Sequence, residues 1–154
     1  MKIQIAYEIS VTNFDGVVSS LTLITVIGFA VCYVAWWLKP LKHRTFLLFW
    51  GVCAGIGGAL LLGTKVAEHL YVYTQYSNDN YELIEGTVNV LRLQPEHGHA
   101  AGDLIEIAGQ KLEVDYFTSA PGYHISIANG GVLQDGVYAR VYVYDGLLLK
   151  IEHR

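Results

Sequence analysis

Two long runs of uncharged, apolar residues dominate the first half of the chain, extending from Val17 to Leu38 and from Thr45 to Thr64. About 20 apolar residues match the ~30 Å hydrocarbon core of a bilayer. Lipid offers no hydrogen bonds to a backbone, so such runs are helical there. The pattern predicts a two-helix transmembrane hairpin over residues 15–76, with Asp15 as a candidate cap of the first helix.

A different pattern precedes the first run. From Ile3 to Val11 large apolar residues alternate with polar residues or Ala6, and this period of two indicates a half-buried β-strand. A lone strand is not stable in water. We therefore expect the N-terminal segment 1–14 to contribute a strand that pairs with a sheet edge of the C-terminal half, in the same chain or in a neighbouring copy. A frayed terminus is the alternative.

After Thr64 the pattern stays helical through Lys65, Glu68 and His69, which predicts a protrusion of about two turns. Tyr71, Tyr73 and Tyr76 then mark the outer membrane interface. Lys65 and Glu68 are three residues apart on this extension, a spacing that favours an ion pair. The polar stretch 77–80 then predicts a linker.

The last part of the chain, residues 80–154, reads as short strands separated by turn residues. We expect five strands, at 81–93, 104–108, 111–117, 137–144 and 147–152. Gly86 predicts a bulge in the first of them. Gly109 marks one hairpin turn, and Asp145-Gly146 is a strong signal for a second. The segment 118–136 is rich in glycine turns and predicts an irregular crossover.

Five strands in about 75 residues, with a long bent first strand, fit a small all-β OB-like barrel. An SH3-like barrel is the alternative. The predicted fold is therefore a membrane helical hairpin followed by a soluble OB-like domain, to which the N-terminal strand is expected to add.

Small residues recur every fourth position along the second apolar run, at Gly51, Gly55, Ala59 and Gly63. Such spacing lets helices approach closely in lipid, where no hydrophobic drive exists between them. The face predicts helix packing or oligomerisation with another copy. Packing against the chain's own first helix is the alternative.

Charge predicts a topology. The connector 39–44 carries Lys39, Lys42 and Arg44, whereas the first sixteen residues carry Lys2 against two acids. The positive-inside rule places this connector in the cytoplasm, so both termini face the periplasm of a bacterial inner membrane. The N-terminus lacks the pattern of a cleaved secretory signal, so we expect a retained anchor. Trp36, Trp37 and Trp50 lie near the connector, as expected of an aromatic belt.

From residue 78 onward, eleven acidic residues face five Lys and Arg, a net charge of about −6. This balance disfavours nucleic acid as a partner, because phosphate binding requires a surplus of cations. Cys32 and Cys53 lie inside the apolar runs, so no disulfide is expected in the soluble part.

One strand carries the strongest candidate surface. Tyr138, Arg140, Tyr142 and Tyr144 alternate with apolar residues and share one face. Exposed aromatic residues around an arginine are typical of protein contacts. The prediction is a surface for a protein partner, for the N-terminal strand or for the membrane, with cross-strand packing as the alternative.

Other candidate chemistry is weak. Glu96, His97 and His99, with His124, form a possible metal-ligand set, but histidines in a glycine-containing loop are more often polar turn residues. Glu113 and Asp115 flank Val114 and are expected to be solvated. We predict no metal, no cofactor and no catalytic residue.

The sequence from Glu106 to Glu152, IAGQKLEVDYF…PGYHISIANGG…GVYARVYVYDGLLLKIE, resembles a small uncharacterised bacterial family in which a compact OB-like β domain lies next to membrane helices. Ala128-Asn129 and Leu112 depart from that family's pattern of Ser-His and an aromatic residue. The order of helices followed by five strands, with the hairpin from Gly136 to Leu149, is also similar to NfeD-type proteins. That resemblance implies contact with membrane scaffold partners.

Three functions are consistent with these patterns. The first is a noncatalytic, oligomeric accessory or scaffold protein of the inner membrane that presents a periplasmic OB-like domain to other proteins. The second is a ligand-gated membrane effector whose β domain binds a nucleotide-like signal in the cytoplasm. The third is an NfeD-like partner of a membrane scaffold or protease. Topology separates the first two.

Overall fold

The computed structural model describes residues 3–14, 16–38, 43–97 and 100–154. The predicted cap Asp15, the connector lysines Lys39 and Lys42, and His99 lie outside the described residues. The chain divides into two compact units. We call Phe14–Leu70 the helical unit, and Met1–Asn13 together with Tyr71–Arg154 the β unit.

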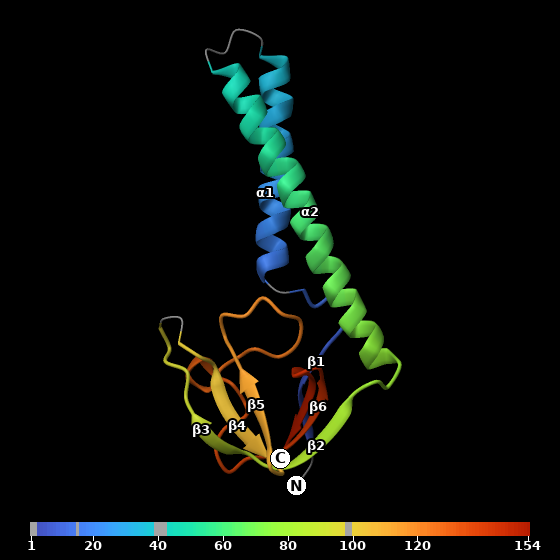
Figure 1. Cartoon of the computed structure of the whole chain (residues 1–154), viewed down its shortest axis with the longest axis vertical. Helices are drawn as coiled ribbons and strands as arrows, with labels where there is room; N and C mark the ends of the chain where they lie inside the picture. The colour runs from blue at the N-terminus through green and yellow to red at the C-terminus, as the bar shows by residue number, and fades with distance from the viewer. Residues whose placement is uncertain (1–2, 15, 39–42, 98–99) are drawn as a thin grey trace. The chain divides into compact units, whose positions relative to one another are not determined.

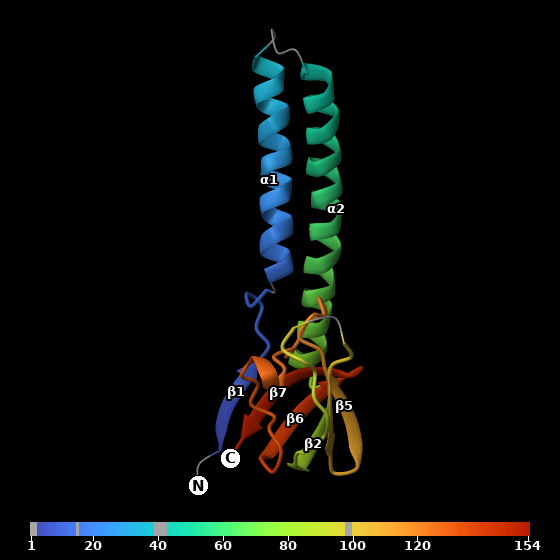
Figure 2. The same cartoon turned by 90° about the vertical axis from the view of Figure 1, so that its left-hand side faces the viewer.

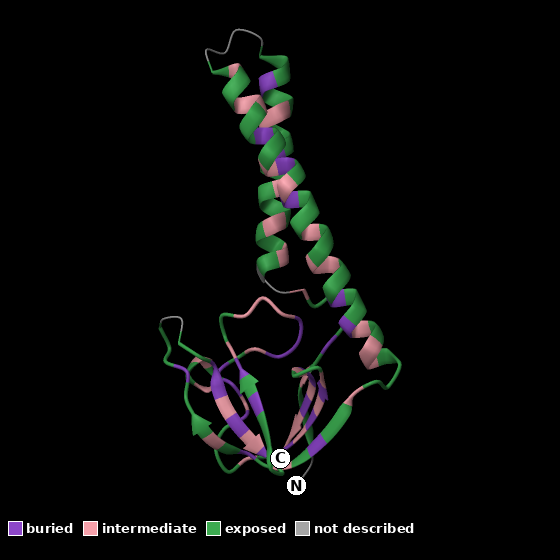
Figure 3. Ribbon diagram, in the orientation of Figure 1, coloured by how far each residue is buried: buried purple, intermediate pink, exposed green. Residues whose placement is uncertain are grey.

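The predicted pair of apolar helices is confirmed. They are α1 (Gly16–Trp37) and α2 (Arg44–Ser77), which pack side by side as a hairpin in the helical unit (Figures 1 and 2). Both are long and apolar enough to cross a membrane. Only 6% and 17% of their most apolar windows are buried, and most of both ribbons is coloured as exposed in Figure 3. A core helix of a soluble protein would instead bury an apolar stripe.

The β unit contains two antiparallel sheets. The strand order of the larger sheet is β1-β7-β6-β2, and that of the smaller is β3-β4-β5. Figure 2 shows β1, β7, β6 and β2 in this order. Among the described residues, no ladder closes the two sheets into a barrel. The strands are β1 (Gln4–Glu8), β2 (Glu82–Thr87), β3 (Asn89–Arg92), β4 (Asp103–Ile107), β5 (Gln110–Val114), β6 (Tyr138–Tyr144) and β7 (Leu147–His153).

The predicted N-terminal strand exists and pairs within its own chain. β1 runs antiparallel to β7, with Gln4 opposite His153 and Glu8 opposite Lys150. Beyond the strand, the Ile9 amide donates to the Leu149 carbonyl at 2.8 Å. The register shifts between Ile5 and Tyr7, so the uniform alternation of the sequence is not a uniform ladder.

Both predicted hairpins are confirmed. β4 joins β5 through Ala108-Gly109, and β6 joins β7 through Asp145-Gly146. All four turn residues have positive φ, at 51°, 82°, 49° and 77° in chain order. Positive φ at both central residues is the geometry of the type I′ turn, whose twist matches that of the strands.

The single strand predicted over 81–93 is wrong, because the structure divides it into β2 and β3 at Val88. The Val88 amide donates to Val137 at 2.8 Å, and its carbonyl accepts from the Gly136 amide at 2.9 Å. The predicted bulge at Gly86 is also wrong, since Gly86 pairs with Ala139 in regular register. The crossover 118–136 is irregular as predicted, apart from the short 3₁₀ helix η1 (Ile127–Asn129).

The main core of the β unit lies between the two sheets, where Figure 3 colours the strands purple. Ile105 and Ile107 of β4 and Val141 of β6 are fully buried there. Burial alternates along β6, with Ala139, Val141 and Val143 inside. This confirms that one face of the predicted strand packs the core.

The last turns of α2 belong to the β unit and pack on the other face of the larger sheet. Val72 of α2 forms a second buried cluster with Ile9 and Leu149. α2 continues to Ser77, which is about three and a half turns beyond Thr64 rather than the predicted two. The predicted ion pair on this extension is present, with Lys65 Nζ 2.9 Å from Glu68 Oε2.

Candidate functional site

The small-residue face of α2 is divided between two environments. A Cβ built on Gly51 would lie 2.7 Å from Cys32 Sγ, and one on Gly55 would lie 3.1 Å from the Phe29 ring. Both glycines are buried, whereas Ala59 and Gly63 are exposed. Gly51 and Gly55 therefore pack against α1 of the same chain, which is the alternative that the sequence left open.

Two further small residues complete the helix contact. A Cβ on Gly28 of α1 would lie 2.4 Å from the Gly55 nitrogen, and one on Gly58 would lie 2.5 Å from Thr25 Oγ1. Neither belongs to the four-residue repeat, and Gly28 stands on the other helix. The close approach of α1 and α2 thus depends on glycines of both helices.

The predicted tyrosine face exists on β6, but its own chain covers part of it. The Tyr144 hydroxyl lies 3.1 Å from that of Tyr71. The Tyr142 ring packs edge-on against Tyr81, with centroids 5.1 Å apart, and Lys150 Nζ lies 5.2 Å from its centroid. Cross-strand and helix packing therefore use Tyr142 and Tyr144.

The other two residues of the tyrosine face are more accessible. Arg140 Nε lies 2.6 Å from Glu85 Oε2 on the neighbouring strand β2. This carboxylate raises the pKa of the Arg140 guanidinium. Tyr138, at the start of β6, is exposed.

An ionic cluster lies between β1 and β7. Lys150 Nζ is 3.1 Å from Glu152 Oε1 and 3.8 Å from Glu8 Oε1. The hydrogen bond with Glu152 raises the pKa of Lys150, against the opposing effect of desolvation. Glu8 also accepts a 2.5 Å hydrogen bond from the Tyr76 hydroxyl of α2. The cluster ties β1, β7 and the end of α2 together.

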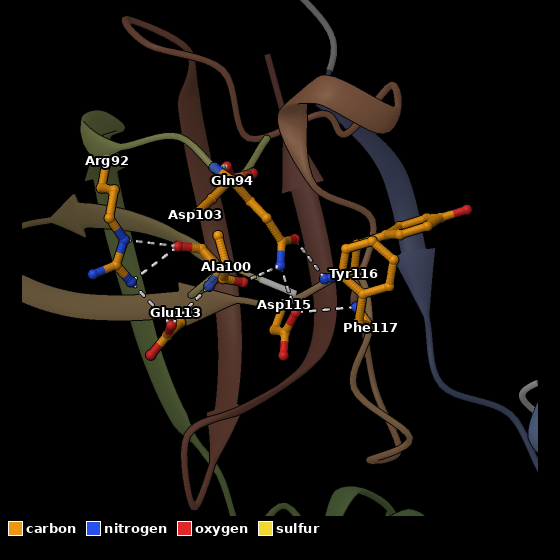
Figure 4. Close-up of polar contacts among 9 residues, drawn as sticks. Arg92, Gln94, Ala100, Asp103, Glu113, Asp115, Tyr116 and Phe117 are labelled. Carbon is orange, nitrogen blue, oxygen red and sulfur yellow. Dashed lines mark hydrogen bonds and ion pairs between the residues drawn. The ribbon is translucent and has the colours of Figure 1, made fainter. Parts of the chain in front are cut away.

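A buried polar network lies at one end of the smaller sheet, where β3, β4 and β5 meet their loops (Figure 4). Gln94 and Asp103 are each 1% exposed. The Asp103 carboxylate accepts hydrogen bonds from the backbone amides of Gln94 and Ile127, both at 2.6 Å. The buried carboxylate therefore joins the loop after β3 to η1, as buried charge requires hydrogen-bond partners.

The Gln94 side chain extends the network to the loop after β5. The side-chain nitrogen Nε2 donates to Asp115 Oδ1 at 2.6 Å and to the Ala100 carbonyl at 3.0 Å. The side-chain oxygen Oε1 accepts from the Tyr116 backbone amide at 2.9 Å. Asp115 Oδ1 also accepts from the Phe117 amide at 3.0 Å. Asp115 is thus a structural acceptor, contrary to the expectation that it is merely solvated.

Glu113 is exposed, as expected, and it also makes polar contacts. Its Oε1 lies 3.0 Å from Arg92 Nη2 and accepts from the Gly102 amide at 2.9 Å. Arg92 also donates to the Gly102 carbonyl. Figure 4 shows Arg92 and Glu113 turned toward each other beside the network.

A recess of about 270 Å³ lies next to this network. Its lining combines Glu113 and Asp115 with Thr118, Tyr123 and His124, and includes the turn residue Gly146. His124 Nδ1 lies 3.0 Å from the Gly122 carbonyl. Two carboxylates and two hydroxyl groups suit a cationic or hydrogen-bond-donating group and disfavour an anion.

Two aromatic residues that the sequence reasoning missed stand beside the recess. Tyr116 and Phe117 are 41% and 40% exposed, and their rings pack edge-to-face with centroids 5.3 Å apart. Their amides are both held by the network described above. An apolar pair after an acidic strand end was the signal that could have identified them.

The predicted metal alternative gains no support. Glu96 and His97 are exposed. Within the described residues, His, Cys, Asp and Glu form no group of three or more that could hold a metal ion.

β1 forms one edge of the larger sheet among the residues that the structure describes. β1 is its outermost strand and pairs on one side with β7. Ile3 is exposed just before this strand, and Ile5 within it is 58% exposed. The outermost strand of a sheet is the position at which a further strand can add.

Comparison of the chain with protein-family models, with curated proteins and with solved structures gave no match. The two resemblances of the sequence therefore stay predictions.

Proposed function

We propose that the protein is a noncatalytic, two-span accessory protein of the bacterial inner membrane that holds its β unit at the membrane surface for contact with another protein. One observation carries the proposal. α2 is a single helix that begins at Arg44 and includes the second apolar run, and its last turns, from Tyr71, are part of the β unit. Anchor and sheet thus share one element.

The exposed side chains of both helices support membrane insertion. Leu23, Val26, Phe49, Leu60 and Leu61 are among many large apolar residues exposed along them. Apolar surface in water costs roughly 25 cal/mol per Å², whereas lipid removes this cost. Trp36, Trp37 and Trp50 are exposed near the connector, where aromatic rings favour the headgroup layer.

The outer side of β1 supports protein contact. A partner strand would lie along the outer side of β1, and Ile3 and Ile5 would supply apolar contacts. Since Tyr142 and Tyr144 are used within the chain, the edge of β1 replaces the tyrosine face as the proposed partner surface. Tyr138 and Arg140 are an accessible extension of that sheet.

Self-association through the small-residue face has less support than the sequence suggested. Gly51 and Gly55 pack against α1, which leaves Ala59 and Gly63 exposed. The nucleotide-binding effector is disfavoured by the recess, because Glu113 and Asp115 would repel phosphate.

Topology tests the proposal. A reporter that is active in the periplasm, fused after Arg154, should be active, and the same reporter inserted between Leu41 and Lys42 should be inactive. A cytoplasmic reporter should give the reverse pattern. Activity of the cytoplasmic reporter after Arg154 would overturn the periplasmic assignment and favour the effector.

A further inference from the structure

We propose that the hairpin binds one anionic phospholipid, with an acyl chain in an apolar groove of the helical unit and the headgroup phosphate at Arg44. Every residue of this lipid site belongs to the helical unit. The inference deepens the proposed function and rests on it, because a lipid reaches the groove only if α1 and α2 are inserted in a bilayer.

The groove lies along the part of the hairpin nearest the connector and has a volume of about 290 Å³. Its lining is apolar throughout, with one stripe of α1 and one residue of α2: Ile27, Ala30, Val31, Val34, Ala35 and Leu47. From Ile27 to Ala35 the helical rise is about 12 Å at 1.5 Å per residue. A long hollow with apolar walls fits a hydrocarbon chain and offers a polar ligand no hydrogen bond.

The groove is separate from the contact between the two helices. Gly28 and Gly55 are buried at that contact, whereas Ile27, Ala30 and Val34 of the groove are exposed. Ala30 has only a methyl group between larger neighbours, which leaves a hollow on the outer surface of the hairpin. In the hydrocarbon core, the groups that can fill such a hollow are a lipid chain or another apolar helix.

Arg44 fixes where the headgroup would lie. Its Nε donates to the Ala35 carbonyl at 3.0 Å, and Ala35 lines the groove, so the guanidinium stands at the end of the groove. This bond uses one of the five N–H groups of the guanidinium, and phosphate accepts from arginine in a paired geometry. Trp36 and Trp37, which follow Ala35, are exposed, as expected at headgroup depth.

The charge at this end of the helical unit is one-sided. The connector contains Lys39, Lys42 and Arg44, and no Asp or Glu occurs between Asp15 and Glu68. Asp15 precedes α1, and Glu68 lies about 36 Å of helical rise beyond Arg44 on α2. The helical unit therefore has no carboxylate in its sequence near the connector to balance these cations. An anionic headgroup supplies that balance, since basic residues beside a membrane helix attract anionic lipids.

Charge also argues against a second copy of the chain as the occupant of the groove. A copy with the same orientation in the membrane would bring its own connector to the same depth. Two connectors, each with two lysines and an arginine, would then repel each other. A lipid chain whose phosphate meets Arg44 fills the same hollow without this cost.

Native mass spectrometry of the full chain in a mild non-ionic detergent tests the inference. The probes are phosphatidylglycerol and phosphatidylcholine with the same acyl chains, added in equal amounts and distinguished by mass. The monomer should retain one molecule of phosphatidylglycerol at least about fivefold more often than phosphatidylcholine, the preference expected from one juxtamembrane arginine.

Two variants separate the chain from the headgroup. Ala30→Leu fills the groove and should lower retention of both lipids, whereas the same substitution at Ala59, which is exposed on α2 outside the groove, should not. Arg44→Gln should reduce the ratio of phosphatidylglycerol to phosphatidylcholine about fivefold, and Lys65→Gln, at the other end of the second apolar run, should leave the ratio unchanged. Helical circular dichroism melts of all four variants verify that the hairpin is folded.

Equal retention of the two lipids by a folded wild-type chain would overturn the inference alone. Retention that Ala30→Leu and Ala59→Leu lower equally would also overturn it, because the lipid would then not lie in the groove. A lipid-free dimer that Ala30→Leu dissociates would show that a second copy occupies the groove. A chain that retains no lipid and stays monodisperse after the detergent is removed would contradict the proposed function itself.

Discussion

Gly28 of α1 and Gly55 of α2 pack backbone against backbone, so that a Cβ built on Gly28 would lie 2.4 Å from the Gly55 nitrogen and 2.8 Å from its Cα. No real Cβ approaches backbone atoms so closely. The hairpin is therefore built on a contact that any side chain at Gly28 would disrupt.

Gly28→Leu should destabilise the hairpin by about 1–3 kcal/mol, the usual cost of overpacking. Gly57→Leu is the matched control, because a Cβ at Gly57 meets no atom within 4 Å. Thermal unfolding of the full chain in detergent, followed by helical circular dichroism, measures both. Equal melting temperatures for the two variants would contradict the proposed packing.

Ile9→Ala should destabilise the β unit by about 2–4 kcal/mol, the range for removing a buried isoleucine side chain. Ile9 is 2% exposed and packs with Val72 and Leu149. Ile5→Ala, on the same segment but largely exposed, should change stability by less than about 0.5 kcal/mol. Denaturant unfolding followed by near-ultraviolet circular dichroism gives both values, and similar losses at the two positions would show that β1 is not held as described.

Gln94→Leu should destabilise the β unit by about 2–4 kcal/mol, because it removes the side-chain partner of the Tyr116 amide and of the Ala100 carbonyl. It also removes one of the two hydrogen bonds that Asp115 Oδ1 accepts. Gln134→Leu, at an exposed glutamine, is the control. The same unfolding measurement applies. An unchanged midpoint for Gln94→Leu would mean that water replaces the side chain and that the network does not order the aromatic loop.

Gln94→Glu separates charge from shape at the same position. At neutral pH the new carboxylate would face Asp115, whose Oδ1 lies 2.6 Å from the side-chain nitrogen Nε2 of Gln94. Like charges disfavour joint ionisation. The variant should regain stability relative to wild type as the pH falls below about 5 and one carboxyl becomes protonated. A pH-independent difference would contradict this contact.

The β unit should lose stability in alkaline solution. Burial raises the pKa of Tyr123 above its ordinary value of 10.0, so above pH 10 the unfolded chain releases a proton that the folded chain retains. The contribution of Tyr123 to the free energy of unfolding is fully present below that pH and decreases as the pH rises toward the pKa of the folded state. Lys150, whose pKa is also raised, acts in the same direction.

Tyr123→Phe tests the tyrosine contribution. The variant removes the acceptor of the Val132 amide, which lies 2.9 Å from the phenol oxygen, and should cost about 1 kcal/mol at pH 7. It should also flatten the fall in unfolding free energy above pH 10. A variant with the same alkaline slope as wild type would assign that slope to other groups.

Local patterns predicted those parts of the fold that local chemistry determines. Asp145-Gly146 specifies a type I′ turn by its own conformational preferences, and the two apolar runs specify helices by composition. The alternation from Ile3 to Val11 predicted a strand. The need to cover a lone strand predicted a sheet edge as its partner, but no residue of the segment identified β7 or decided between the same chain and a neighbouring copy.

Features set by distant contacts were not predictable in the same way. Val88 looks like any residue of an alternating strand, yet its backbone bonds go to Gly136 and Val137, 48 and 49 positions later. Gln94 and Asp115 are 21 positions apart, so neither sequence neighbourhood indicates a shared network. The four-residue repeat identified a helix face, but it could not reveal Gly28 on the other helix.

The most direct test of the account is the state of the full-length chain after its host membranes are washed with alkaline carbonate. We predict that the protein remains in the membrane pellet and is released by detergent, as expected for two spanning helices. Release by carbonate as a monodisperse species in detergent-free buffer would contradict the central claim, because α1 and α2 would then be covered by protein and not by lipid.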